Sequence, residues 1–127
     1  MNRSRYYTGL GKMRPPRWRY MHGACLSFAL ALHEEVGWPL VRIQDSTGGF
    51  IHVACSVSGK LADVRGLSSR YGMRAYFGGD RLKFCAMRPR AIADARKRQR
   101  RAFGKAEIVR AKRYAHRLLS GGAFDVR

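Results

Sequence analysis

The stretch FIHVACSVSGKLADVRG, residues 50–66, decides the fold of this chain. Its first part alternates between the two faces of a β-strand, with small or apolar side chains on both. The more apolar of these faces is formed by Ile51, Val53, Cys55 and Val57. The dipeptide Ser58-Gly59 then closes a two-residue turn, and KLADV returns as a second strand. We therefore predict an antiparallel hairpin.

The turn length also fixes the register of this hairpin. With a two-residue loop Val57 faces Lys60, which places His52 opposite Arg65. Asp63 then shares a face with His52 as its diagonal neighbour, at about 7 Å between the backbones. We therefore predict that these two polar side chains reach each other inside otherwise apolar strands.

Charge is the strongest property of the whole sequence. The chain has 127 residues, enough for one domain with a single core, and a formal net charge of +18. Most of this charge lies in residues 1–20 and 88–117, around a nearly neutral centre. Arginine predominates over lysine, and its planar guanidinium binds phosphate and carboxylate through paired hydrogen bonds. We expect nucleic acid or a nucleoprotein complex as a partner, with a merely solvated basic surface as the alternative.

A helix and a short strand precede the hairpin. Apolar residues recur at helical spacing from Cys25 to Val36, and Gly37 ends the pattern. Residues 38–44 form a short strand that Pro39 separates from this helix. Before the helix, Arg, Tyr and Trp mix without a period, which indicates an extended arm.

The rest of the chain is less regular at first and then helical. Residues 66–87 contain several glycines, and only a short strand at 82–86 is predicted there. Two basic helices follow, from Pro89 to a stop at Gly104 and then over 105–120.

The expected fold is α+β, with a small antiparallel sheet packed against an N-terminal helix carrying Cys25 and with basic C-terminal helices. The chain divides into a basic arm rich in Arg and aromatic residues (1–20), a core (21–87) and a basic helical extension packed on that core (88–127).

Cysteine usage indicates a reducing compartment. An odd number of well-separated cysteines argues against a disulfide scaffold. The apolar run at 24–32 begins late and has helical spacing, unlike a cleaved signal, and no segment is long enough to span a bilayer. We expect a cytoplasmic protein without membrane contact.

Three residues of the core have the types needed for thiol chemistry. Cys25 lies at the start of a helix, where unpaired N–H groups and the helix dipole favour the nucleophilic thiolate. His52 can accept the thiol proton, and Asp63 can fix the tautomer and orientation of the imidazole. The backbone N–H of Cys25 would supply one oxyanion donor.

These residues carry a resemblance to a known family. The segments GACLSFALALHEEVGWPL and GFIHVACSVSGKLADVRG resemble the core of papain-like and transglutaminase-like cysteine enzymes, over residues 22–67. The resemblance implies that Cys25 is the nucleophile, His52 the base and Asp63 the orienting group in acyl transfer through a thioester.

The chain also differs from the family pattern. The short spacing from Cys25 to His52 implies a minimal sheet, and Val53 stands where an aromatic residue is expected. No Gln or Asn precedes Cys25 at the place of the usual second oxyanion donor. The candidates for that donor are Tyr20, His22 and Gln44.

Metal binding is the alternative chemistry. His22, Cys25, His52 and Cys55 form two H-x-x-C pairs, but residues three apart on a strand point to opposite faces and cannot share one zinc ion. The sequence HEE at 33–35 matches H-x-E of zinc deaminases, but no P-C-x-x-C follows. We therefore expect no metal and no other cofactor.

The basic flanks suggest sequence-independent phosphate binding, because no specific nucleic-acid-binding motif is present. The predicted binding residues are Arg17, Arg19, Arg96, Lys97, Arg98, Arg100, Arg101, Arg110 and Arg113.

Two functions follow. The first is a small cysteine peptidase, deamidase or acyltransferase that acts on an amide, ester or side-chain amide. Its basic flanks would bring it to an acidic or nucleic-acid-bound target, with a protein as a possible substrate. The alternative is a non-catalytic basic protein that uses the same fold to dock on nucleic acid or a ribonucleoprotein, such as a phage-type inhibitor.

Overall fold

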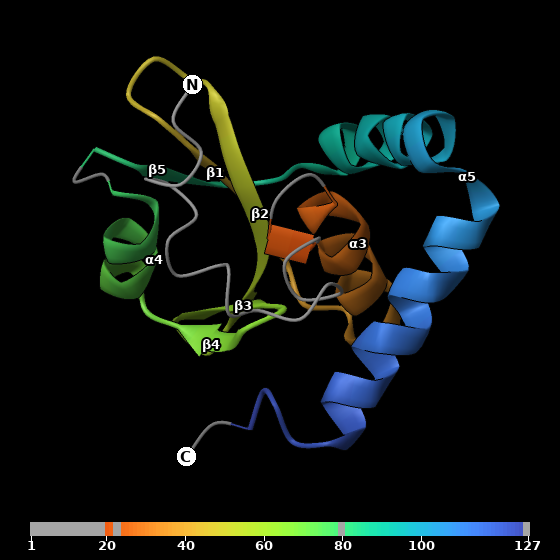
Figure 1. Ribbon diagram of the computed structural model, residues 1–127. Coiled ribbons are helices and arrows are strands. Elements are labelled where there is room, and N and C mark those ends of the chain that lie inside the picture. The colour runs from red at the N-terminus through yellow and green to blue at the C-terminus, as the bar shows by residue number, and fades with distance from the viewer. Residues whose placement is uncertain (1–19, 22–23, 79–80, 126–127) are drawn as a thin grey trace, which may run out of the picture.

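A five-stranded antiparallel sheet forms the centre of the computed structural model, which describes residues 20–21, 24–78 and 81–125. The strand order is β4-β3-β2-β1-β5. The strands are β1 (Leu40–Gln44), β2 (Phe50–Val57), β3 (Lys60–Asp63), β4 (Gly66–Ser68) and β5 (Lys83–Ala86). The helices are α3 (Cys25–Val36), α4 (Arg70–Phe77) and α5 (Pro89–Ser120). Helices α3 and α5 lie on one side of the sheet and α4 on the other, so the expected α+β fold is confirmed (Figure 1).

The hairpin has the predicted register. Val57 pairs with Lys60, and Cys55 pairs with Ala62. Ser58 and Gly59 both have positive φ angles, 48° and 80°, as a type I′ turn requires. This turn twists in the same sense as the strands and therefore holds the register that brings His52 and Asp63 to one face.

The two faces of β2 belong to two hydrophobic clusters. Val53 and Cys55 pack toward α3 and α5, whereas Ala54 packs with Met73 of α4 on the opposite face. His52 is on the α4 face, where its ring centroid lies 5.1 Å from that of Phe77. The sheet is therefore covered on both faces, which explains why a histidine in β2 is fully buried.

Segment 66–87 contains more structure than the sequence predicted. The short strand near its end is confirmed as β5, but β4 and α4 were missed. Helix α4 begins after Ser69, whose Oγ accepts a hydrogen bond from the backbone N–H of Gly72, and ends at Gly78 with φ 71°. Gly72 inside α4 weakens the local helix signal, so tertiary packing of Met73 outweighs propensity here.

Helix α5 joins the two predicted basic helices across a kink. Gly104 has φ 77° and ψ 178°, a conformation open almost only to glycine, and helical backbone continues on both sides of it. The second half packs on α3 through Ala111 and Ala115. Neither α5 nor any other helix in the described ranges is long and apolar enough to cross a bilayer.

The predicted arm 1–20 lies outside the described residues except for Tyr20. This residue is helical and buried, and its ring stacks on that of Tyr114 at 5.6 Å between centroids. Tyr20 therefore belongs to the core rather than to an extended arm.

Candidate active site

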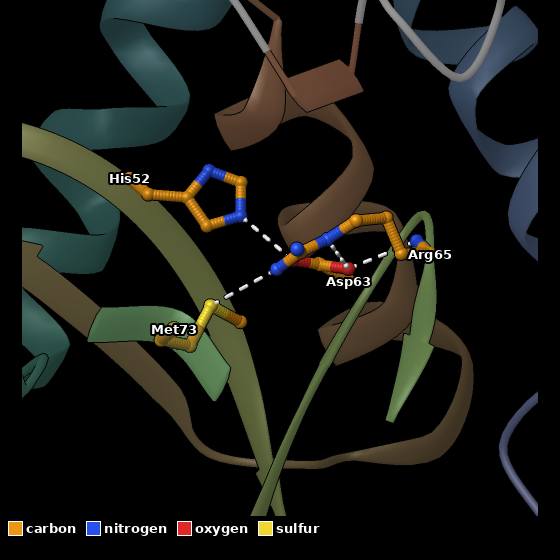
Figure 2. Close-up of polar contacts among 4 residues, drawn as sticks. All are labelled: His52, Asp63, Arg65 and Met73. Carbon is orange, nitrogen blue, oxygen red and sulfur yellow. Dashed lines mark hydrogen bonds and ion pairs between the residues drawn. The ribbon is translucent and has the colours of Figure 1, made fainter. Parts of the chain in front are cut away.

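A buried histidine and a buried aspartate form the centre of the site. The Nε2–H of His52 donates to Oδ2 of Asp63 at 3.0 Å, and the side chains are 0% and 2% exposed (Figure 2). Asp63 ends β3, and its partner comes from the neighbouring strand β2. The diagonal contact expected from the hairpin register is therefore present.

Arg65 completes the pair into a closed ionic cluster. Its guanidinium donates to Oδ2 of Asp63 at 3.1 Å, and its backbone N–H donates to Oδ1 at 2.9 Å. The same guanidinium lies 4.0 Å from the ring centroid of Tyr76 and donates to Sδ of Met73, as Figure 2 shows for the methionine. Burial would raise the pKa of Asp63, but the hydrogen bond from His52 and the charges of His52 and Arg65 lower it below 3.8.

Cys25 is the first residue of α3 and interacts with the same histidine. Burial would lower the pKa of His52, but the hydrogen bond to Asp63, the interaction with the nearby Cys25 thiol and the negative charge of both groups raise it from 6.5 to about 9. Nε2 is occupied by Asp63, and buried Nδ1 makes no hydrogen bond of standard geometry in the described part of the chain. The imidazole is therefore held by the carboxylate through Nε2, while Nδ1 has no described hydrogen-bond partner and the thiol acts on the ring through its charge.

The short strand β3 leaves His52 beyond the last pair of its ladder with β2. β3 pairs only with Cys55–Val57, so no described strand pairs with the β3 side of β2 beside His52. In Figure 2 the His52 ring points from β2 toward Asp63. Strand pairing on this side of β2 therefore stops at Cys55, before His52.

Cys25 also lines a pocket of about 200 Å³ on the α3 and α5 side of the sheet. Aromatic side chains of Phe50 and Phe103 line it, together with Arg42. Gln99 of α5 lines the same pocket, is only 5% exposed, and makes no side-chain hydrogen bond to a described residue. The thiol is thus placed between a histidine and a pocket that carries an available amide.

The expected second oxyanion donors are not at this pocket. Tyr20 and Gln44 do not line it, and His22 lies outside the described residues. The amide of Gln99 is a donor that sequence reasoning missed, because it comes from α5, far along the chain. Leu26 also lines the pocket, so the start of α3, where backbone N–H groups lack intrahelical partners, borders it as well.

The other two cysteines have different surroundings. Cys55 is buried, its Sγ donates to the carbonyl of Ala29 at 3.4 Å, and burial raises its pKa to about 12. Cys85 is exposed on β5. Neither has a hydrogen bond to a described histidine, so they provide internal references for the reactivity of Cys25.

Metal ligands are not assembled around these residues. Among the residues that the structure covers, no three of His, Cys, Asp and Glu lie close enough to hold an ion. His52 and Cys55 lie on opposite faces of β2, as the alternation of the strand predicts.

The predicted nucleic-acid-binding residues fall into three groups. Arg17 and Arg19 lie outside the described residues. Arg96 pairs with Glu34 at 3.5 Å, and Arg110 pairs with Glu107 at 3.0 Å. The residues that are exposed and make no ion pair with a described residue are Lys97, Arg98, Arg100, Arg101 and Arg113.

No protein-family model matches the chain, and no curated protein or solved structure is significantly similar to it.

Proposed function

We propose that this chain is a small cysteine hydrolase or acyltransferase with Cys25 as nucleophile, His52 as acid and base, and Asp63 as the orienting group. One observation carries this proposal. A fully buried imidazole donates to a carboxylate at 3.0 Å, its second nitrogen has no hydrogen-bond partner among the described residues, and the thiol at the start of α3 helps to raise its pKa. A histidine held only for packing needs no thiol near enough to raise its pKa.

The first half of the reaction forms a thioester. Sγ of Cys25 attacks the carbonyl carbon of an amide or ester bound in the adjoining pocket, and the carbonyl electrons move to oxygen. The His52 imidazolium favours the thiolate through its charge and then donates its proton to the leaving nitrogen or oxygen. The C–N or C–O bond breaks, which leaves the acyl group on Cys25.

The second half releases the acyl group. Neutral His52 takes a proton from water or from an acceptor amine, whose lone pair attacks the thioester carbonyl. The C–S bond breaks, and the products are a carboxylic acid or a new amide and the free cysteine. Asp63 stabilises the imidazolium in both halves and cannot rotate away, because Arg65 holds its second oxygen.

Gln99 and the backbone at the start of α3 would stabilise the oxyanion. The Gln99 amide lines the pocket beside Cys25 without a described hydrogen-bond partner, so it is available to a carbonyl oxygen. We expect Gln99→Leu to slow acylation by about 10²–10³-fold, as is typical for removal of one oxyanion donor.

Selective alkylation tests the proposal without a known substrate. At mildly acidic pH, where an ordinary exposed thiol is protonated, we expect iodoacetamide to modify Cys25 faster than Cys85, and Cys55 slowest. Peptide mapping by mass spectrometry gives the three rates in one sample. Since Cys25 is buried and Cys85 is exposed, access alone would give the opposite order.

Variants identify the cause of the selectivity. His52→Gln is expected to slow labelling of Cys25 and leave Cys85 unchanged, and a p-nitrophenyl ester should acylate the wild type but not Cys25→Ala. Circular dichroism of Cys25→Ala checks that the fold is retained. Equal rates for Cys25 and Cys85, or rates at Cys25 that do not depend on His52, would contradict the proposal.

The exposed side of α5 supports a second candidate function, sequence-independent nucleic-acid binding without chemistry. Lys97, Arg100 and Arg101 lie on one side of the helix and make no ion pair with described residues. Neutralising these three should weaken binding of a fluorescent oligonucleotide uniformly across sequences. It should also reduce the salt dependence of binding, by about 0.9 in log–log slope for each duplex phosphate that the protein no longer neutralises. Salt-insensitive binding would exclude this candidate, and Cys25→Ala serves as the control that should bind normally.

A further inference from the structure

A second pocket adjoins the one at Cys25 and is lined by arginines. It measures about 500 Å³ and lies where β5 leads into the first turns of α5. Arg42, Met87 and Arg98 line both pockets, so the two are adjacent. Arg88 and Arg90 complete the cationic lining, which also includes exposed Cys85.

The charges of this second pocket are not balanced by ion pairs within the described part of the chain. Asp94 is the one acid among its lining residues, against four arginines. None of these four makes an ion pair with a described residue, and Nε of Arg42 is buried without a hydrogen-bond partner in the described part of the chain. Arg65, by contrast, is fully engaged by Asp63. Like charges held this close repel one another, and a bound anion would relieve that repulsion.

The pocket has three more positive than negative charges, which favours an anion that carries more than one negative charge. A single carboxylate neutralises one guanidinium, whereas a phosphoryl or diphosphoryl group carries about two or three negative charges at neutral pH. Guanidinium groups bind phosphate oxygens through paired hydrogen bonds, and several can share one group. The chemistry of the lining therefore fits phosphate better than an isolated carboxylate.

We propose that this arginine pocket is a phosphate-binding subsite, and that the acyl substrate of Cys25 carries a phosphoryl or diphosphoryl group. The substrate class rests on the proposed function, because it requires Cys25 to act on the group in the adjoining pocket. The acyl carbon lies against Cys25, and the phosphate lies between Arg42, Arg88, Arg90 and Arg98. The subsite fixes the distance between the two groups on the substrate and so defines which amides or esters react.

Cys85 provides a reporter that does not depend on catalysis. In the Cys25→Ser protein, pyrophosphate is expected to protect Cys85 from iodoacetamide, because Cys85 lines the proposed subsite. Titration calorimetry gives the affinity in the same variant. Removing one guanidinium, in Arg88→Gln or Arg90→Gln, should weaken pyrophosphate binding by about tenfold or more.

Matched variants distinguish this subsite from general attraction to a basic protein. Arg100→Gln with Arg101→Gln removes charge from the exposed side of α5, which lines neither pocket, and should leave pyrophosphate protection intact. The phosphates of a nucleic-acid backbone are the other possible source of the ligand, and a thymidine oligonucleotide without terminal phosphate tests them. We expect binding of this oligonucleotide to depend on Arg100 and Arg101 instead.

Three results would overturn the proposal. The first is that pyrophosphate gives Cys85 no protection, and the second is that succinate protects Cys85 as well as pyrophosphate does. The third is that the Arg100 and Arg101 variant loses as much protection as Arg88→Gln or Arg90→Gln. Each can occur while Cys25 remains selectively alkylated in the wild type. Failure of the subsite is therefore distinguishable from failure of the thiol chemistry.

Discussion

The molecule holds two groups of charged side chains that differ in how their charge is balanced. Beside α4, Asp63 is paired with His52 and Arg65 in a buried cluster whose charges are compensated internally. At the start of α5, four arginines line an open pocket with Asp94 as its acid. The first arrangement fixes the position of an imidazole, and the second leaves charge available to a ligand. How a charge is compensated therefore separates an orienting role from a binding role.

Removing the acid from each group should have very different effects on stability. Asp63→Asn leaves buried His52 and half-buried Arg65 without their carboxylate partner, so we expect it to lower the free energy of unfolding by about 3–5 kcal/mol. Asp94→Asn changes an exposed residue and is expected to alter it by less than about 0.5 kcal/mol.

Urea unfolding followed by circular dichroism measures both variants of this pair. An unchanged slope with denaturant would show that only stability differs. Similar losses for Asp63→Asn and Asp94→Asn would refute the distinction between the two groups.

Removing one arginine from each group gives a smaller contrast. Arg65→Met removes the guanidinium hydrogen bonds to Asp63 and the interaction with Tyr76, for an expected decrease in stability of about 1.5–3 kcal/mol. The decrease stays below that of Asp63→Asn because Asp63 keeps His52 and the backbone N–H of Arg65. Arg88→Gln, in the pocket, should be neutral or slightly stabilising in the same denaturation experiment, and a clear destabilisation would contradict us.

The protonation of His52 reports directly on the closed cluster. Its pKa is raised to about 9 in the folded protein against 6.5 for an ordinary imidazole. The protonated contact therefore contributes stability that is complete below pH 6.5 and is lost as pH rises through about 9. For Asp63, whose pKa is lowered, the stabilisation is present above 3.8 and is lost as pH falls through the folded value.

Imidazole NMR resonances give the His52 value directly. The pKa should fall in Asp63→Asn and in Cys25→Ala, because each variant removes one of the groups that raise it. His33, whose Nδ1 lies against the carbonyl of Trp38 away from the cluster, is the internal control. If the pKa of His52 changed in neither variant, the proposed interaction between its imidazole and the Cys25 thiol would be contradicted.

The hairpin could be predicted from the sequence and much of its surroundings could not. Strand alternation and the Ser58-Gly59 turn are local signals, and together they define the register that joins His52 to Asp63. Helix α4 had a local signal too, a Ser69 cap followed by Met73 and Phe77 four residues apart, but glycines obscured it.

The residues that surround His52 and Cys25 could not be predicted in this way, because their positions depend on tertiary structure. Gln99 reaches the Cys25 pocket because α5 packs against α3, and no spacing in the sequence connects the two residues. Arg65 was placed opposite His52 by the register, yet its hold on Asp63 follows from the turn after β3 rather than from strand pairing. Sequence patterns predict neighbours within one element or hairpin, whereas the closing of a site requires the packed fold.

The smallest difference between the buried cluster and the arginine pocket should be in how salt changes their contribution to stability. Raising NaCl from about 0.1 to 1 M shortens the screening length from about 10 to 3 Å and weakens repulsion between exposed arginines, while the buried cluster is little affected. We expect a stability increase of up to about 1 kcal/mol in the wild type, the usual scale for exposed charge interactions. Arg88→Gln with Arg90→Gln should reduce this increase, because part of the repulsion is then already gone, whereas Arg65→Met should keep it in full. An increase that is unchanged without Arg88 and Arg90 would mean that the pocket arginines do not repel one another, and the case for an anion between them would lose its electrostatic basis.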